Sequence, residues 1–337
     1  QTVVMNFEEP FAAWVSQFWF RLLPEHVLRP VFESDGTLDN AAWNLAPTVS
    51  AGPYVFAEWE SGSYARFVRN ENYWGQSPNI DEIFIRFVPD DASQVAALQA
   101  GHGGLGALIA HAHIPTLGAG GVNIVAGPAY QDPSLEAWPY DPDRARALLD
   151  EAGWVDSNGD GVRDKDGVEL VLRYGTTTRE IRTDTQAVVQ QQLADVGVGV
   201  ELSSYASNIF FAGYANGGPF ATGQLDIGQW SSAPSFPDPD SENWRCSEIP
   251  SDEKPDGGNW SALCDEELDS LFQLQSTQVD FDERQQTFYQ ISKHMYDNVY
   301  WLGVWQDPDV WAYSSRLANV TISGANPFSQ IVEWDIE

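Results

Sequence analysis

Four oxygen-bearing side chains recur at short intervals in one stretch of this 337-residue chain. They are Asp156, Asn158, Asp160 and Asp164. Their spacing matches positions one, three, five and nine of a calcium-binding loop, in which such oxygens bind the ion. At the twelfth position stands Gly167 in place of the usual bidentate Glu, so Asp166 or Glu169 would have to replace that ligand. Because Asp and Asn also stabilise turns, we favour a hairpin without a cofactor, and calcium remains the alternative.

A second polar group lies between a strand expected at residues 168–174 and a helix expected at residues 183–196. In open α/β sheets, ligands bind outside the carboxyl ends of the strands. Tyr174, Thr177 and Arg179 are therefore candidate ligand-binding residues, whose hydroxyl and guanidinium groups suit a carboxylate or sugar hydroxyls. A solvated loop without a ligand is an equally good interpretation.

Aromatic side chains form a third group. The chain has 14 Trp, which exceeds the usual need of a core, and some of them are expected to line a cleft and stack on a ligand. Trp230 and Phe236 are the candidates for stacking. A core position for Trp230 is the open alternative.

Residue patterns typical of metal binding or of enzyme catalysis are weak or absent in the sequence. His102, His111 and His113 lie in the Gly-rich segment 101–121, which we interpret as a solvated loop or linker. The chain has neither a Gly-x-Ser-x-Gly nucleophile elbow nor a Gly-x-x-x-x-Gly-Lys phosphate loop. We therefore expect no enzyme activity. A secreted glycoside hydrolase is a remote alternative, because nothing places two carboxylates at facing strand ends.

Cys246 and Cys264 are the two cysteines of the chain, and a polar, turn-rich loop without His separates them. A metal site would need more ligands at close spacing. We therefore favour a disulfide over two free thiols, which implies an oxidising compartment. Closing a loop of this size contributes about 3 kcal/mol in the chain-entropy model.

Composition narrows the class of protein. The hydrophobic fraction of 43% and the aromatic fraction of 13% indicate a packed globular chain, long enough for two domains. The 17 Lys and Arg against 49 Asp and Glu give a net charge of −32, which repels the phosphates of nucleic acid and of anionic lipids. No run of 18 apolar residues exists. The chain begins inside an expected strand, residues 2–7, so we expect the sequence to have been cut from a longer one.

Regular elements must position these groups. Strands are expected at residues 54–56, 64–68 and 83–88, and again at 168–174, 198–202 and 225–230, the last three separated by helices as in α/β units. Asp141 and Pro142 indicate a helix start. Two further helices are expected from Asp265 and from Asp282, followed by an aromatic strand at 299–305.

The order of several segments resembles the extracytoplasmic solute-binding proteins, family 5, of peptide-type ABC importers. In the first part these segments are residues 52–54, 58–59, 69–75, 83–90 and 96–101. In the second part they are residues 139–154, 190–202, 230, 237–240 and 264–269. Relatives also carry a long N-terminal portion and a long segment after the helix that ends near residue 101, so the chain looks shortened or incomplete.

The resemblance implies a periplasmic-binding-protein-like fold with two α/β lobes joined by a hinge. Residues 1–128 with 303–337 would form the first lobe and residues 129–302 the second. Such a protein clamps a small solute between its lobes, without making or breaking a bond, and delivers it to the permease subunits of an ABC importer. We expect an oligopeptide as the solute, with an oligosaccharide as the alternative. We also expect a monomer, located in the periplasm or at the cell surface and lipid-anchored in its full-length precursor.

The resemblance also points to a cleft loop after Trp230. In peptide-binding relatives an Asp near this position holds the ammonium group of the ligand. Here Ala233 or Ser235 stands at that place, which weakens the case for a free peptide N-terminus as the anchor. Ser235 and Asp238 complete the candidate ligand-binding residues.

Overall fold

The computed structural model describes residues 2, 4–18, 22–38, 41–88, 93, 96–97, 105–108, 128–231, 241–304, 310–322 and 328–337. The chain divides into two compact units. Unit 1 comprises Gln1–Gln17 and Ile114–Gln306, and unit 2 comprises Phe18–His113 and Asp307–Glu337. The sequence instead grouped residues 1–17 with the other lobe. In the structure the backbone N–H of Ala12 donates to Ser276 O at 2.8 Å, within unit 1. The boundaries of two moving lobes stay a prediction.

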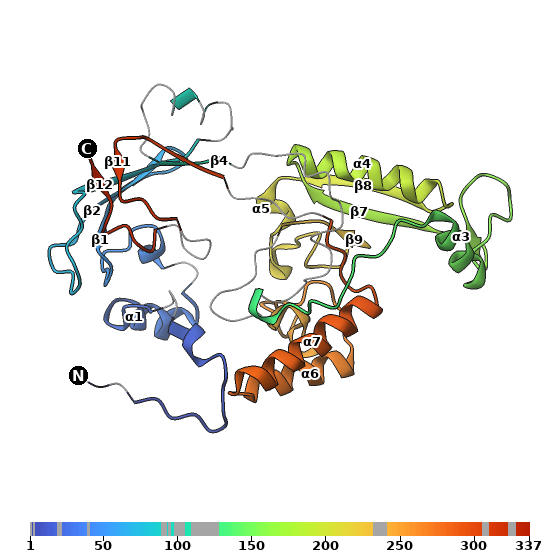
Figure 1. Ribbon diagram of the computed structural model, residues 1–337, viewed down its shortest axis with the longest axis horizontal. Helices are drawn as coiled ribbons and strands as arrows, with labels where there is room; N and C mark the ends of the chain where they lie inside the picture. Colours follow the sequence, from blue (N-terminus) through green and yellow to red (C-terminus); the bar gives the residue numbers. More distant parts are fainter. Residues whose placement is uncertain are drawn as a thin grey trace. The chain divides into compact units, whose positions relative to one another are not determined.

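Unit 1 contains a parallel sheet with the strand order β8-β7-β9. Its strands are β7 (Val171–Thr177), β8 (Gly199–Tyr205) and β9 (Ile227–Gly228). Helix α4 (Glu180–Ala194) connects β7 to β8 and lies along both strands (Figure 1). This is the βαβ order that alternating strand and helix patterns predict. Buried Gln186 of α4 donates to Tyr174 O at 2.9 Å, so a polar side chain ties the helix to the sheet.

Local signals fix the elements before this sheet. Helix α3 (Pro142–Glu151) begins as predicted, because the Asp141 carboxylate accepts from Arg144 N at 2.8 Å and Pro142 needs no donor in the first turn. A short hairpin follows, formed by β5 (Asp164–Lys165) and β6 (Val168–Glu169).

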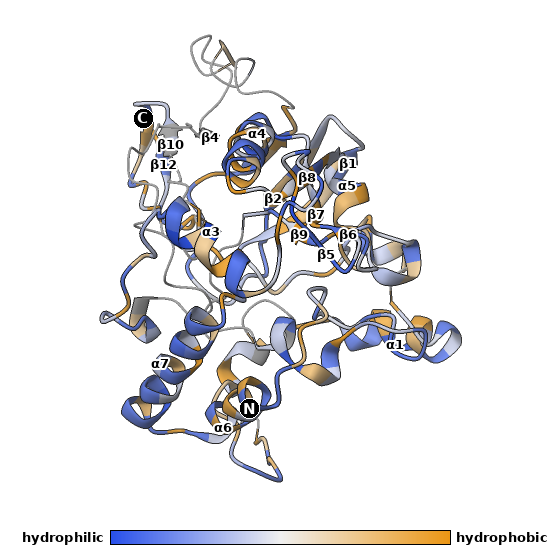
Figure 2. Cartoon of the chain, turned by 90° about the vertical axis from the view of Figure 1, so that its right-hand side faces the viewer, coloured by the Kyte–Doolittle hydropathy of each residue, from blue (hydrophilic) through white to orange (hydrophobic). Residues whose placement is uncertain are grey.

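Two helices carry the main core of unit 1. They are α6 (Glu266–Thr277) and α7 (Phe281–Asp297). The buried core residues are Trp244, Leu268, Phe272, Phe288, Ile291 and Met295. Those on α7 recur every three or four residues, so one side of that helix packs inward. The side of α7 visible in Figure 2 is mainly hydrophilic, as expected for the opposite face.

Unit 2 is built from antiparallel pairs. Strands β1 (Tyr54–Glu60), β2 (Tyr64–Arg69) and β3 (Glu82–Arg86) were each expected from the sequence, and in the structure they form one antiparallel sheet. Helix α1 (Glu25–Asp35) ends at Gly36, whose φ of 71° is the left-handed conformation that favours glycine. The remaining pairs are β4 (Leu105–Leu108) with β10 (Val310–Tyr313), and β11 (Leu317–Ala318) with β12 (Asp335–Ile336).

Short helices complete the described chain. They are η1 (Trp14–Phe18), η2 (Ala42–Asn44), η3 (Pro128–Tyr130), α5 (Ser207–Phe210), η4 (Tyr214–Asn216), η5 (Glu242–Trp244) and η6 (Cys246–Glu248).

Two expected strands are corrected by the structure. Described residues 4–7 contain no strand, and Val4 and Phe7 are exposed there. Residues 299–304 contain none either. Val299, next after the C-cap of α7, has a φ of 56°, and this left-handed residue turns the chain instead of extending it.

Candidate solute-binding site

The carboxyl ends of the three parallel strands of unit 1 define one edge of the sheet. At this edge β7 ends at Thr177, β8 at Tyr205 and β9 at Gly228. Thr178 N donates to Tyr205 O at 3.0 Å, and Gln229 N donates to Gly175 O at 3.0 Å. The loop before α4 and the segment after β9 therefore start side by side, at the place where open α/β sheets bind ligands.

Gln229 fixes the start of the segment after β9. Its backbone oxygen accepts from Thr176 Oγ1 at 2.7 Å, and its side-chain Oε1 accepts from the Tyr174 hydroxyl at 2.6 Å. Tyr174 is only 3% exposed, and burial raises the pKa of its hydroxyl to about 12. The structure thus places the predicted ligand residue Tyr174 inside unit 1, where it supports the sheet edge.

Arg182 joins the loop, the helix and the segment after β9. Its Nη1 donates to Thr177 Oγ1 at 2.7 Å, and its Nη2 donates to Ser231 Oγ at 2.9 Å. Arg179 Nη1 also donates to Ser231 Oγ, at 3.4 Å. The structure therefore links the predicted residues Thr177 and Arg179 through Arg182 and Ser231. The result is a cluster of guanidinium and hydroxyl groups, chemistry that suits a carboxylate.

Sequence reasoning missed Arg182, Ser231 and Gln229. Arg182 follows Arg179, the N-cap of α4, by three residues, so the two arginines are neighbours at the start of that helix. That spacing was a usable signal for Arg182. Ser231 and Gln229 flank Trp230 in the sequence, and only the pairing of β9 with β7 shows that they reach the edge.

Trp230 is half-buried and belongs to an aromatic cluster. Its ring lies 4.6 Å from that of Phe220 and 4.7 Å from that of Trp301, the latter edge to face. Phe220 in turn meets Trp260 edge to face at 5.7 Å. Trp230 therefore packs on the cluster and keeps part of its surface accessible, and stacking on a ligand stays a prediction. Phe236, Ser235 and Asp238 lie outside the described residues, as do the three histidines of segment 101–121.

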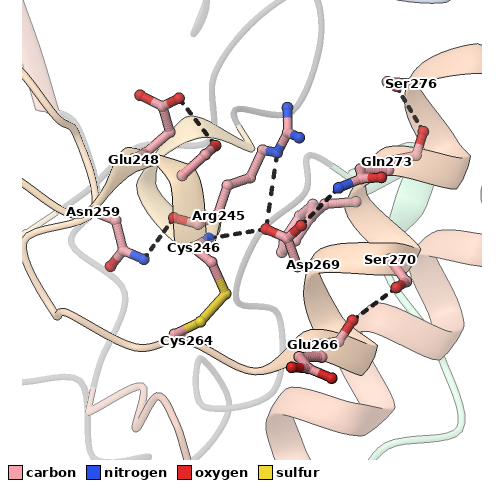
Figure 3. Close-up of polar contacts among 12 residues, drawn as sticks. Arg245, Cys246, Glu248, Asn259, Cys264, Glu266, Asp269, Ser270, Gln273 and Ser276 are labelled. Carbon is pink, nitrogen blue, oxygen red and sulfur yellow. Dashed lines mark hydrogen bonds and ion pairs between the residues drawn. A yellow bond between two sulfur atoms is a disulfide. The ribbon is translucent and has the colours of Figure 1, made fainter.

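The expected disulfide is present, and the loop that it closes contains Trp260 of the aromatic cluster. The Sγ atoms of Cys246 and Cys264 are bonded, with a Cα–Cα distance of 4.7 Å (Figure 3). Cys246 N donates to Asp269 Oδ1 of α6 at 2.9 Å. The loop that the disulfide closes includes Trp260, whose indole nitrogen donates to Gly257 O at 3.1 Å. The disulfide therefore restrains the segment that carries one member of the cluster.

Asp265, His294 and Tyr300 form a hydrogen-bonded triad next to Trp301 of the aromatic cluster. Asp265, the N-cap of α6, accepts from His294 Nε2 at 2.8 Å and from the Tyr300 hydroxyl at 2.7 Å, both on its Oδ2 atom. These bonds, with the one from Leu268 N, hold the pKa of the Asp265 carboxyl well below its usual range. Because Trp301 follows Tyr300, the triad anchors the ring on which Trp230 packs.

In the calcium-like loop, the side-chain oxygens accept hydrogen bonds from groups of the chain itself. The Asp156 carboxylate accepts from Gly159 N at 2.7 Å and from Gly161 N at 3.0 Å. Asn158 and Asp160 likewise accept from backbone N–H groups two residues ahead. Asp164 accepts from the Ser157 hydroxyl and N–H, which lower its pKa. These bonds are those of a turn. Within the described part, no group of three or more His, Cys, Asp or Glu is placed to hold a metal ion, and calcium binding stays untested.

Among the helices of the described residues, none is long and apolar enough to cross a bilayer.

Comparison with known proteins places this fold. The family model of bacterial extracellular solute-binding proteins, family 5, matches residues 1–124 and 118–248. The oligopeptide-binding protein AppA of Bacillus subtilis (strain 168) is 26% identical over 237 residues, which cover 53% of this chain and 43% of that protein. The chain spans about half the length of the curated relatives it matches.

Solved structures agree on the architecture. AppA from Bacillus subtilis, in complex with a nonapeptide, has a TM-score of 0.74 at 20% identity, covering 98% of this chain and 75% of that one. NikZ from Campylobacter jejuni, in complex with Ni(L-His), has a TM-score of 0.75 at 18% identity, covering 97% of this chain and 75% of that one. The predicted two-lobed α/β, periplasmic-binding-protein-like fold is thereby confirmed. With its family model matched over most of its length, the chain belongs to the bacterial extracellular solute-binding proteins of family 5.

Proposed function

We propose that this chain binds a small oligopeptide and delivers it, chemically unchanged, to the permease subunits of an ABC importer. The observation that carries the proposal is the cluster of Thr177, Arg182 and Ser231 beside half-buried Trp230, at the carboxyl edge of the β8-β7-β9 sheet. In a member of a solute-binding family, this edge is the expected place for a ligand.

The chemistry of the edge favours a ligand with a carboxylate. Guanidinium groups and hydroxyls donate to anionic oxygens, and two arginines offset the repulsion that a chain of net charge −32 exerts on an anion. Trp230 adds an apolar face beside them. A peptide carries both a terminal carboxylate and apolar side chains. The solved relatives are compatible with this, since AppA holds a nonapeptide and NikZ holds Ni(L-His), and both ligands contain carboxylates.

An oligosaccharide is the second candidate. Trp230 and the hydroxyls of Thr177 and Ser231 suit a sugar ring, which stacks on an aromatic face and exchanges hydrogen bonds with hydroxyls. The guanidinium cluster is what ranks it second, because a neutral sugar gains less from charged donors than a carboxylate does.

Membership of the family also suggests the cellular location of the protein. We propose a periplasmic or cell-surface location with a lipid anchor in the full-length precursor, and action as a monomer. We expect no nucleic-acid partner, because the net charge of −32 repels phosphates.

Calorimetric titration tests the ligand class. We expect saturable, one-to-one binding of peptides of two to nine residues, weaker binding of the same peptides with an amidated C-terminus, and no saturable binding of neutral oligosaccharides. Mass spectrometry of the released ligand is expected to find it intact. Binding of oligosaccharides alone supports the second candidate, and a cleaved ligand contradicts a transport role.

A pair of variants tests the site. Trp230→Ala is expected to weaken peptide binding about tenfold, which corresponds to about 1.4 kcal/mol for one lost aromatic contact. Trp74→Ala is the matched control, because this tryptophan is 83% exposed in unit 2 and belongs to no part of the proposed site. Equal affinities of the two variants would contradict a role of Trp230 in binding.

A further inference from the structure

Two acceptor sequences for N-linked glycans occur in this chain. They are Asn259-Trp260-Ser261 and Asn319-Val320-Thr321. An Asn-x-Ser/Thr triplet whose middle residue is not Pro accepts a glycan in surface loops of exported proteins. The family of this chain is extracellular, so the chain meets the condition of export. In the structure the two asparagines differ in exposure, since Asn259 is buried and Asn319 is exposed.

Asn259 is closed to modification. Its side chain has 0% exposure. The amide nitrogen, which would carry the sugar, donates to Arg245 O at 3.0 Å (Figure 3). It also donates to Leu263 O at 2.8 Å. The amide oxygen accepts from the Ser261 hydroxyl at 2.7 Å. Both hydrogens of the nitrogen are in use, and a glycan there would force the disulfide-closed loop out of place.

Asn319 has the opposite environment. It is exposed, and it follows directly after the last residue of β11, so the triplet lies beyond the β11–β12 ladder. Its φ of 59° is the left-handed conformation that Asn tolerates better than most residues. Within the described part of the chain, nothing hydrogen-bonds its amide. Thr321, which the modifying enzyme must also recognise, is exposed as well.

An open hollow of about 570 Å³ adjoins this triplet within unit 2. Its lining residues are Gln76, Asn79, Asn319, Val320, Thr321 and Glu333. Amide, hydroxyl and carboxylate groups of this lining are hydrogen-bond partners for sugar hydroxyls. A first sugar residue bonded to Asn319 therefore has both room and polar partners beside it.

We propose that Asn319 is an N-glycosylation site of the exported protein and that Asn259 is not. The co-reactant is a lipid-linked oligosaccharide phosphate. The Nδ2 atom of Asn319 forms a bond to C1 of the donor sugar, while the bond from C1 to the phosphate oxygen breaks. The bonding electron pair leaves with the lipid phosphate, and the amide proton passes to a base of the transferase. The inference holds whichever solute the chain binds.

Peptide mapping of the protein purified from its source cells tests this inference. No Lys or Arg follows Arg316, so trypsin releases residues 317–337 as a single peptide. The buried triplet falls on another peptide, residues 246–284, because Lys254 is followed by Pro255 and trypsin does not cut there. We expect mass spectrometry to find a glycan on peptide 317–337 and none on peptide 246–284.

Conservative variants expressed in the same cells sharpen the test. Thr321→Ala is expected to abolish the modification while leaving Asn319 in place, and Thr321→Ser is expected to retain it. Far-ultraviolet circular dichroism checks that both variants fold. An unmodified 317–337 peptide in the wild type overturns the proposal. A glycan on peptide 246–284, or one that survives Thr321→Ala, also overturns it.

Discussion

Replacing Asp265 tests how a helix cap and a partly buried charge together stabilise unit 1. One carboxylate oxygen caps α6 by accepting from Leu268 N at 3.0 Å. The other accepts from His294 Nε2 at 2.8 Å and from the Tyr300 hydroxyl at 2.7 Å. Asp265→Ala removes the cap and the charge together. Asp265→Asn keeps the cap, because Asn is as good an N-cap as Asp. It replaces the oxygen that accepts from His294 and Tyr300 by an NH2 group, which removes the charge and both of those bonds.

The magnitude follows from these contacts. A lost N-cap costs about 1 kcal/mol. A hydrogen bond to a charged group contributes about 1.5–3 kcal/mol, and with side-chain exposures of 16% for His294 and 18% for Asp265 little solvent screens it. Because the two bonds share one oxygen, their contributions do not add fully. We expect Asp265→Ala to lower the free energy of unfolding by about 3–4 kcal/mol and Asp265→Asn, which keeps the cap, by about 2–3 kcal/mol.

The same carboxylate predicts a direction with pH. The bonds from His294, Leu268 and Tyr300 depress the pKa of Asp265 in the folded state. A depressed pKa contributes stability that is fully present above the unfolded value of about 3.9 and is lost as the pH falls toward the folded value. We therefore expect the wild type to lose this contribution below about pH 4, and Asp265→Asn to lack that part of the acid transition.

Urea unfolding followed by circular dichroism, from pH 3 to pH 7, measures both effects. Tyr300→Phe is the matched control, because it removes one hydrogen bond and leaves the cap and the charge. It is expected to cost less than Asp265→Ala. Equal losses in the Ala and Asn variants at pH 7 would refute the contribution of the cap, and an unchanged acid transition in Asp265→Asn would refute that of the charge.

Three further outcomes are expected. Burial raises the pKa of Tyr174 to about 12. The stability that its neutral hydroxyl contributes is therefore complete below the unfolded pKa of about 10 and is lost as the pH rises toward about 12. Urea unfolding between pH 8 and pH 12 should show a smaller alkaline loss of stability for Tyr174→Phe than for the wild type. Joint replacement of Cys246 and Cys264 by Ser is expected to lower the free energy of unfolding by about 3 kcal/mol, and a thiol reductant should shift the wild-type midpoint to that of the variant without moving the latter. Millimolar Ca²⁺ is expected to leave the melting temperature unchanged, because backbone N–H groups already bind both oxygens of Asp156, and a rise that Asp156→Asn abolishes would instead establish a metal site.

Local signals in the sequence predicted much of the secondary structure. The helix start at Asp141 and the cap at Asp265 depend on side-chain bonds within three residues, so the sequence contains all the needed information. The strands of the β1-β2-β3 sheet have turn residues at their ends and were placed for the same reason. By contrast, α4 begins at Glu180 and not at residue 183, since no side chain caps its start.

Features that depend on the fold were out of reach. The aromatic run from Val299 has strand-like composition, yet a left-handed Val299 turns the chain, and Trp301 packs on Trp230 and Trp244. Composition cannot reveal that change of direction. The spacing of Arg182 to Arg179 is visible in the sequence, but the pairing of β9 with β7, which brings Ser231 to Arg182, is not.

The proposed site is positioned by buried polar bonds more than by the residues that would touch a solute. Gln229, only 8% exposed, receives hydrogen bonds from Tyr174 and Thr176 and itself donates to the sheet backbone, and Trp230 is the next residue. Immobilising groups on binding costs affinity, and groups that the fold already holds in place avoid that cost. Since β9 has only two residues, its few ladder bonds alone would hold this segment weakly. The side-chain bonds to Gln229 therefore explain how so short a strand presents Trp230 and the neighbouring hydroxyl in a fixed arrangement.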